Sequence, residues 1–354
     1  MEQKSYNGID IIKFICAVLV VMIHFPPLGD SKIPAVKYIN FGLQNYLARI
    51  AVPFFFIAAG FLLYRKSVAD SIVSEYVVVY IKKILRLYVI WTLIYFPLML
   101  RGFFNDPKGM LHAIVTYAHY TIFTGSAPQL WYLTALIFAV FLTSFLLYRK
   151  VRPATIAAIA LVFYIAGLFA QSWFGFIAHF EYSIPGLWRL LKTIQAVIIT
   201  TRDGLFDGFL FVSIGMCFAF YNYKMRQKKA LIMFILSMTA LLVEVFLLQY
   251  FGFAREHDMY LFLVPAASFM FVLAVNMQLP DSPAYKTIRH LSSLIFLYVL
   301  VYYYISWLMN ACIRPMPAGP YGFLITLLFL FALSYTIILL SDKDHFKWLK
   351  KIYM

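Results

Sequence analysis

Charged residues are scarce in this sequence, and the motifs of common soluble enzymes are missing from it. Only 13% of the 354 residues are Asp, Glu, Lys or Arg, whereas 63% are hydrophobic; a soluble domain is about a quarter charged. The chain contains no phosphate-binding loop, no GxSxG, no HExxH and no CxxC. These absences exclude a soluble globular class and remove support for the chemistries that those motifs serve.

Cysteine is rare as well. Cys16, Cys217 and Cys312 each lie alone in an apolar segment, so their spacing fits neither a disulfide framework nor a zinc site. We therefore expect no metal and no bound cofactor. The net charge of +15 does not indicate nucleic-acid binding, because the basic residues fall in short loops. Residues 1–27 do not match a cleaved signal peptide, since Asp10 and Lys13 interrupt the apolar region.

Long apolar stretches dominate what is present, and they predict an all-α, polytopic membrane protein. Ten of them are long enough to span a bilayer: 9–27, 46–64, 84–103, 128–148, 153–171, 204–222, 230–252, 258–279, 291–311 and 320–340. Segment 110–124 is too short to span and is expected to lie in the interface or to re-enter, and 186–200 has the pattern of an amphipathic surface helix. Residues 1–341 are assigned to one transmembrane domain and 342–354 to a short basic cytoplasmic tail.

The distribution of positive charge predicts the orientation of these spans. With the N-terminus in the cytoplasm, the inner loops hold 19 of the 30 Lys and Arg residues and the outer loops hold nine. This bias follows alternate loops along the chain, as the positive-inside rule requires. We expect both termini in the cytoplasm of a bacterium and the spans in its cytoplasmic membrane.

The first apolar stretch carries three ionisable residues, Asp10, Lys13 and His24. Lys13 and His24 are separated by three full helical turns plus about 20°, so they project from one face of the helix. They lie roughly 16 Å apart along its axis. Asp10 is one turn before Lys13 and can pair with it. Because ionisable groups are costly in hydrocarbon, this polar stripe is a candidate catalytic site. The simpler alternative for His24 is a histidine that caps the helix beside two prolines.

A basic cluster begins the third stretch. Lys82, Lys83 and Arg86 share a helix face at its cytoplasmic end, and such a cluster could hold the phosphates of a nucleotide-like donor. The alternative is an anchor that contacts lipid phosphates.

A second set of residues is expected on the acceptor's side, and its members are Arg49, Trp131, Arg202, Glu244, His257 and Asp258. Arg202, Asp203, Asp207, His257 and Asp258 could line one outward-facing polar pocket together with His24 and Arg49. Trp131 has the position of an aromatic-belt residue, and charges in outer loops are often simply solvated. Glu244 lies deep in the seventh stretch, where three roles remain open: proton relay, acceptor binding or structural hydrogen bonding.

Several motifs resemble those of the acyltransferase-3 family of membrane proteins. NGIDIIKFICAVLVVMIHF resembles the family's opening helix, with Lys13 where arginine is usual. RIAVPFFFIAAGFLLY resembles its second helix, with Ala59 in place of serine, and IKKILRLY and QLWYLTALI are similar to later elements. SWFGFI, TRDGLFDG and HDMYLFLVP further resemble the membrane half of the vancomycin-resistance serine racemases of the VanT type. Val301 stands where the family often has a histidine.

The resemblance implies a function and roles for these residues. Acyl-CoA, usually acetyl-CoA, would bind at the cytoplasmic side through Lys82, Lys83 and Arg86. The acyl group would pass along the stripe from Lys13 to His24, which would serve as base or carrier for a hydroxyl on an outer envelope glycan or similar acceptor.

Two other functions remain open. The chain could transport serine or another small amino acid, as is thought of the VanT-type membrane half, or it could be a scaffold descended from an enzyme. The expected partners are the lipid bilayer and the acceptor, with a homo-oligomer or a separate protein partner left open.

Overall fold

Helices are the regular secondary structure of the part of the chain that the structure describes, and turns and loops connect them. This computed structural model describes residues 6–70, 73–104, 107–178, 180–298, 301 and 319–354. Within these residues, chain contacts define two compact units: unit 1 comprises 1–55 and 271–354, and unit 2 comprises 56–270. The boundaries fall inside two helices, α3 (Ala51–Asp70) and α13 (Leu263–Asn276).

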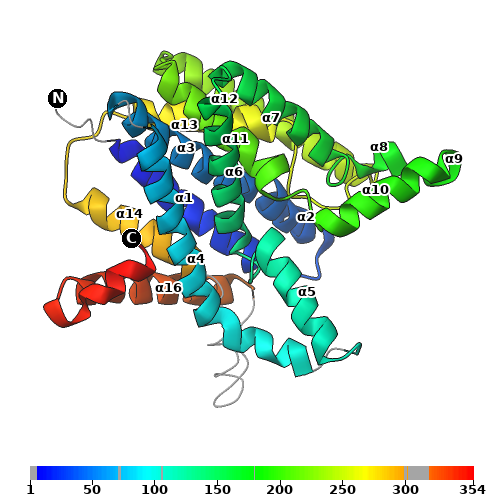
Figure 1. The fold of residues 1–354 in the computed structure, drawn as a ribbon, viewed down its shortest axis with the longest axis horizontal. Coiled ribbons are helices and arrows are strands. Elements are labelled where there is room, and N and C mark those ends of the chain that lie inside the picture. Colours follow the sequence, from blue (N-terminus) through cyan, green and yellow to red (C-terminus); the bar gives the residue numbers. More distant parts are fainter. Residues whose placement is uncertain (1–5, 71–72, 105–106, 179, 299–300, 302–318) are drawn as a thin grey trace. The chain divides into compact units, whose positions relative to one another are not determined.

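Unit 1 is built around the first helix. Its elements are α1 (Asn7–His24), α2 (Pro34–Gly42), a π-helical turn η1 (Leu43–Leu47), a 3-10 turn η2 (Ala48–Ile50), α14 (Ala284–Tyr298), α16 (Gly319–Ser341) and a 3-10 helix η4 (Asp344–Ile352). α1 packs mainly against α14, which also contacts α16 (Figure 1). Gly8 lets α1 approach closely at one point, because a Cβ there would meet the carbonyl of Ala274.

Unit 2 holds the remaining helices. They are α4 (Val73–Phe104), α5 (Met110–Phe123), α6 (Trp131–Tyr148), α7 (Pro153–Leu168), α8 (Phe174–Ala178), α9 (Phe180–Ser183), α10 (Pro185–Ile198), a π-helical turn η3 (Gly204–Gly208), α11 (Phe209–Phe220) and α12 (Gln227–Tyr250). α11 lies beside α6 and α7 (Figure 1), and η3 contacts the same two helices.

Several of these helices are long and apolar enough to span a bilayer. Among the described residues, five helical stretches are long and apolar enough to cross it: α1, Pro34–Ser67, α6, α12 and α16. Many large apolar side chains on them are exposed, as a surface that faces lipid would require; Phe141 on α6 and Leu328 on α16 are examples. The chain is thus an all-helical, multi-pass membrane protein, while the count of ten spans and the side of each terminus stay predictions.

The helix positions follow the apolar pattern in part, and α4 begins at Val73, well before the predicted start at residue 84. The second helix begins far before residue 46, because α2, η1 and η2 lead into α3 without a break. The ninth predicted stretch is described only through α14 and Val301, and its remainder lies outside the described residues. Segment 110–124 forms α5, and 186–200 falls mostly within α10.

Segments expected on one side of the membrane meet at one end of unit 1. Asn7 donates from its Nδ2 to Asp281 Oδ1 at 3.0 Å, and the ring of His290 lies 5.0 Å from that of Tyr353 in the C-terminal tail. Tyr353 also shares a hydrogen bond of 2.7 Å with Ser341 Oγ. The start of α1, the start of α14 and the tail therefore lie together, as the charge alternation predicts for segments on one side.

Close packing of α3 against α11 in unit 2 yields a stability prediction. A Cβ on Gly215 would collide with the carbonyl oxygen of Ile57. Because helix backbones cannot shift without losing packing, we expect Gly215→Ala to lower the stability of the detergent-purified protein by about 1–3 kcal/mol. Thermal unfolding measures this directly. Gly186→Ala is the matched control, since nothing lies within 4 Å of its added Cβ; equal unfolding temperatures would contradict the prediction.

Candidate functional site

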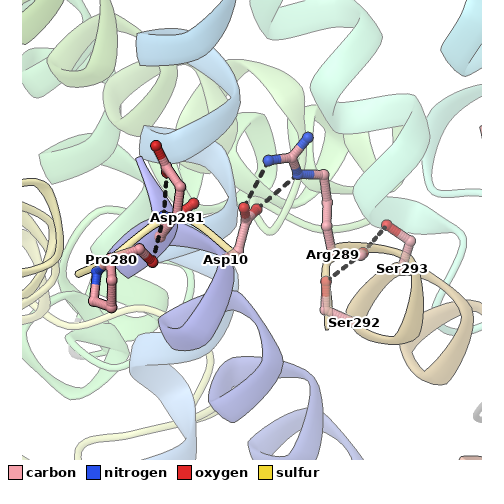
Figure 2. Close-up of polar contacts among 7 residues, drawn as sticks. Asp10, Pro280, Asp281, Arg289, Ser292 and Ser293 are labelled. Carbon is pink, nitrogen blue, oxygen red and sulfur yellow. Dashed lines mark hydrogen bonds and ion pairs between the residues drawn. The ribbon is translucent and has the colours of Figure 1, made fainter. Parts of the chain in front are cut away.

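Asp10 is held by a partner that the sequence argument did not name. Arg289 of α14 donates from Nε to Asp10 Oδ1 at 2.9 Å and from Nη2 to Oδ2 at 2.7 Å, as Figure 2 shows. Asp10 is 3% exposed and lies in the first turn of α1, where the helix dipole also favours a negative charge. The bidentate pair is the strongest geometry for an arginine and a carboxylate.

Lys13 and His24 lie on one continuous helix. α1 runs from Asn7 to His24 without interruption, so the predicted shared face is kept. Both side chains are half-buried. His24 is the last residue of α1, and the preceding carbonyl, that of Ile23, accepts a hydrogen bond of 3.1 Å from Gln44 Nε2. The π-helical turn η1 therefore packs beside the C-terminal end of α1.

Arg49 follows this turn in the same unit. It lies in η2, is half-buried, and donates from Nη2 to Asn45 Oδ1 at 3.0 Å. The segment that carries Arg49 contacts α1. Unit 1 thus brings Arg49 to the helix that ends in His24, whereas the rest of the predicted outer set belongs to unit 2.

The predicted donor cluster lies on α4 of unit 2. Lys82, Lys83 and Arg86 are all exposed on this helix. Further along, α4 fixes the loop between α5 and α6: Tyr88 donates from its hydroxyl to the Thr121 carbonyl at 2.6 Å and accepts from the Ser126 N–H at 2.9 Å. One helix therefore carries the cationic cluster and supports the wall of a cavity.

The same loop needs a glycine at its sharpest point. Gly125 has a φ of +96°, and a Cβ on it would lie 2.6 Å from the backbone nitrogen of Trp131. Side chains rarely adopt this conformation. The hydroxyl of Ser126 shares a hydrogen bond of 2.6 Å with that of Thr92 on α4. The loop that leads to Trp131 is therefore held by α4 as well as by its own backbone conformation.

Trp131, Arg202 and Asp258 line one cavity of about 660 Å³ in unit 2, called here the Arg202 cavity. Arg202 Nη1 lies 3.0 Å from Asp258 Oδ2, and its guanidinium lies 4.9 Å from the centre of the Trp131 ring. An ion pair and a cation–π contact therefore hold one arginine in place. The cavity lies among loops that are predicted to be on the outer side.

Two buried polar atoms of the Arg202 cavity lack partners among the described residues. They are Gln171 Oε1, an acceptor, and Arg202 Nε, a donor. The amide of Gln171 donates from Nε2 to Thr200 Oγ1 at 3.2 Å, which leaves its oxygen available. Since buried polar groups are nearly always satisfied, the cavity suits a ligand that both donates and accepts. A hydroxyl does both.

Glu244 and His257 do not line the Arg202 cavity as the structure describes it. Glu244 Oε1 accepts from Trp173 Nε1 at 3.0 Å and from the Leu261 N–H at 2.9 Å, while Oε2 accepts from the Phe262 N–H at 2.9 Å. Of the three roles left open for this carboxylate, structural hydrogen bonding is the one its contacts match. His257 Nδ1 lies 2.6 Å from the hydroxyl of Tyr260.

A π-helical turn carries further acidic groups beside Arg202. Asp203 precedes η3 and caps it, accepting at Oδ1 from the N–H groups of Leu205 and Phe206 at 2.9 and 2.8 Å. Burial raises the pKa of Asp203 to about 6, although these two hydrogen bonds oppose the rise. Asp207 within the turn is buried and interacts electrostatically with Arg202 and Asp258.

Sequence reasoning missed Arg289 and Gln171. Arg289 is 279 positions from Asp10 along the chain, and no local pattern links residues at that distance. Gln171 ends an apolar run with no charge of its own, so nothing in the sequence marked it. Ala59 is buried on α3 and Val301 is half-buried; the structure gives neither a role.

Comparisons with known proteins give one family match and several relatives that are named racemases. A family model described as an acyltransferase domain, type 3, matches residues 6–339. A serine/alanine racemase of Enterococcus gallinarum is 30% identical over 312 residues, which cover 85% of this chain and 41% of that protein. An amino-acid racemase of Enterococcus faecalis is 28% identical over 276 residues, covering 78% and 36%. The chain thus spans about two fifths of the length of these relatives. No solved structure matches it.

The hydrogen bonds of Glu244 predict that the protein becomes less stable when this carboxylate is removed. Glu244→Ala would leave the N–H groups of Leu261 and Phe262 unpaired just before α13, so we expect a loss of about 2–4 kcal/mol in stability. Thermal unfolding in detergent measures the loss, with Glu75→Ala, an exposed carboxylate on α4, as the matched control. An unchanged unfolding temperature in Glu244→Ala would show that the hydrogen bonds of this carboxylate do not support the fold.

Proposed function

Because the chain belongs to the acyltransferase-3 family, we propose that it moves an acyl group, most simply acetyl, across a bacterial cytoplasmic membrane. The donor would be cytoplasmic acyl-CoA, and the acceptor would be a hydroxyl of an extracytoplasmic envelope glycan or a similar molecule. The observation that carries this proposal is the family match over residues 6–339. The polar Arg202 cavity supports the acceptor side of it.

The Arg202 cavity has the size and lining of a small-ligand site. Its volume of about 660 Å³ lies within the usual range for such sites. The Trp131 ring offers an apolar face, while Arg202 Nε is a donor and Gln171 Oε1 an acceptor with no hydrogen-bond partner in the described part of the chain. A sugar has both apolar C–H faces and hydroxyl groups, and it would use all three groups.

In the proposed reaction His24 removes the acceptor's proton. As the hydroxyl oxygen forms its bond to the acyl carbon, the carbon–sulfur bond of the thioester breaks, and CoA leaves as a thiolate that takes up a proton. His24 serves either as the base for this step or as a transient acyl carrier, in which case the imidazole nitrogen forms the first bond and the acceptor oxygen the second. Lys13, on the same face of α1, supplies positive charge toward the donor's side.

Lys82, Lys83 and Arg86 are proposed to hold the phosphates of acyl-CoA. Their side chains are exposed on one helix, so a soluble donor can reach them. Multiple cations on adjacent turns suit a ligand with several phosphates.

A second candidate function is transport of serine or a similar amino acid. Two observations favour it: a relative is named a serine/alanine racemase, and Arg202 and Asp258 share one cavity. A zwitterion could place its carboxylate on the arginine and its ammonium on the aspartate. Glu244 already accepts three hydrogen bonds, so this carboxylate is given no part in binding the amino acid.

Removal of the His24 imidazole should abolish acyl transfer. We expect His24→Ala to lower alkali-labile acetate in purified envelopes by a factor of at least about 100, the contribution typical of a general base. The measurement compares wild type, a deletion strain, His24→Ala and the matched control His345→Ala, which changes an exposed histidine in the tail.

Two results would redirect the proposal. Equal acetate in all four strains, with the proteins expressed, would remove O-acetylation as the function. Loss of labelled serine uptake in Arg202→Ala under those conditions would favour the transporter instead.

Removal of the cationic side chains of α4 should weaken the binding of acyl-CoA and leave the rate of the acyl-transfer step unchanged. We expect the double variant Lys82→Ala/Lys83→Ala to raise KM for acetyl-CoA roughly tenfold at low salt, with a smaller difference at high ionic strength because salt screens exposed charges. Lys228→Ala/Lys229→Ala is the matched control, since it removes an exposed lysine pair from α12. A KM that changes equally in both double variants would count against a donor site on α4.

A further inference from the structure

An apolar groove of about 1030 Å³ runs along α12 in unit 2 and is called here the α12 groove. One face of α12 supplies a wall through Leu236, Val243 and Leu247, and Phe251, the residue after its end, continues this wall at the same spacing of four residues. Phe176 and Phe262 face this wall from other segments. All six side chains are exposed by at least 39%, so the groove is open rather than enclosed.

The few polar groups of the groove are already satisfied. Thr239 donates from its hydroxyl to the Ile235 carbonyl at 3.0 Å, and Glu244 accepts three hydrogen bonds, one of them from the indole of Trp173. The groove therefore offers an incoming ligand apolar contact and little else. A hydrocarbon is the chemistry that gains most from such a surface.

The α12 groove and the Arg202 cavity are built from the same two chain segments. In the first segment, Phe169 and Trp173 line the groove while Ala170 and Gln171 line the cavity. In the second, which runs from 253 to 262, residues at both ends line the groove, while Arg255, Glu256 and Asp258 between them line the cavity. A polar site and an apolar site thus share two walls.

Backbone hydrogen bonds hold these two segments together. The N–H of Arg255 donates to the Gln171 carbonyl at 3.1 Å, and the N–H of Gly175 donates to the Phe253 carbonyl at 2.8 Å. Gly175 is needed for this approach, because a Cβ there would lie 2.6 Å from the Phe253 ring. The separation between groove and cavity is therefore fixed by the fold.

The groove begins near the middle of α12, at Leu236, and runs to the end that is predicted to be outer. α12 is apolar and long enough to cross a bilayer, and its N-terminal turn holds Lys228 and Lys229, which the charge alternation assigns to the cytoplasm. A groove along Leu236 to Phe251 would then open toward the hydrocarbon of the outer leaflet.

We propose that the acceptor is lipid-anchored, with its hydrocarbon tail in the α12 groove and its hydroxylated head group in the Arg202 cavity. This assignment rests on the proposed acyl transfer and names the class of acceptor. Two arginines, Arg202 and Arg255, and two carboxylates, Asp258 and Glu256, line the cavity. Their charges balance, so a head group with hydroxyls and no large net charge fits it best.

The test follows labelled acetate in cells that make the full chain. After a short pulse, membranes are divided into a butanol-extractable lipid fraction and the remaining envelope glycan, and alkali-labile label is counted in each. Leu247→Trp fills the groove, and Leu231→Trp is its matched control: the two leucines lie on α12, are 49% and 48% exposed, and only Leu247 lines the groove. His24→Ala gives the background.

The proposal expects label to appear first in the lipid fraction, and Leu247→Trp to lower it about tenfold, as the loss of contact with two methylene groups would. Leu231→Trp should match wild type. Thermal unfolding of both variants checks their folding, and Leu236→Trp replaces Leu247→Trp if that protein unfolds.

Three other outcomes overturn the lipid-anchored acceptor. Equal label in the two tryptophan variants would mean that the groove holds bulk lipid or nothing. Label that depends on His24 and never enters the lipid fraction would leave acyl transfer standing and remove the lipid anchor. Label that does not depend on His24 in either fraction would remove the proposed function itself, and this inference with it.

Discussion

A charged group inside an apolar helical bundle must find a partner, because neither lipid tails nor apolar side chains replace the water that it loses. Asp10 meets this requirement through two bonds to Arg289, so the first turn of α1 is tied to α14 across nearly the whole length of the chain. Arg202 meets it through Asp258 and the Trp131 face. Glu244 meets it with two backbone N–H groups and an indole. Each pairing also fixes the position of a loop or a helix end.

The pairings divide the polar residues into those that build the fold and those that remain available to a ligand. The carboxylate of Glu244 has three donors, which is typical of a structural group. Arg202 is different, since its position is set by two contacts while its Nε has no partner among the described residues. An arginine that is held firmly and still has a donor to offer is well prepared for binding, because little side-chain freedom is lost when the ligand arrives.

Much of the helical framework could be predicted from apolar runs, because a bilayer leaves few alternatives to a helix. The beginning of the second helix could not, since the polar residues Lys37, Asn40 and Gln44 hide its continuation through α2 and η1. Trp131, Arg202 and Asp258 were grouped from their shared side of the membrane, and they do line one cavity; their part in catalysis stays a prediction. Glu244 was placed with them because the sequence shows how deep in the membrane a residue lies but not which way its side chain points. The backbone N–H groups that bind this carboxylate could not be predicted, because any residue type can supply them.

The π-helical turn η3 lies between the Arg202 cavity and α11. Such a turn holds one more residue than an α-helical path would, and it is often found beside functional sites. Removing a single residue from Gly204–Gly208 would restore ordinary spacing and rotate everything before it by about 100° relative to α11. The guanidinium of Arg202 would then face another direction, and the contacts of η3 with α6 and α7 would change with it. The one residue that this turn holds in excess of an α-helical path therefore sets the direction from which Arg202 faces the cavity.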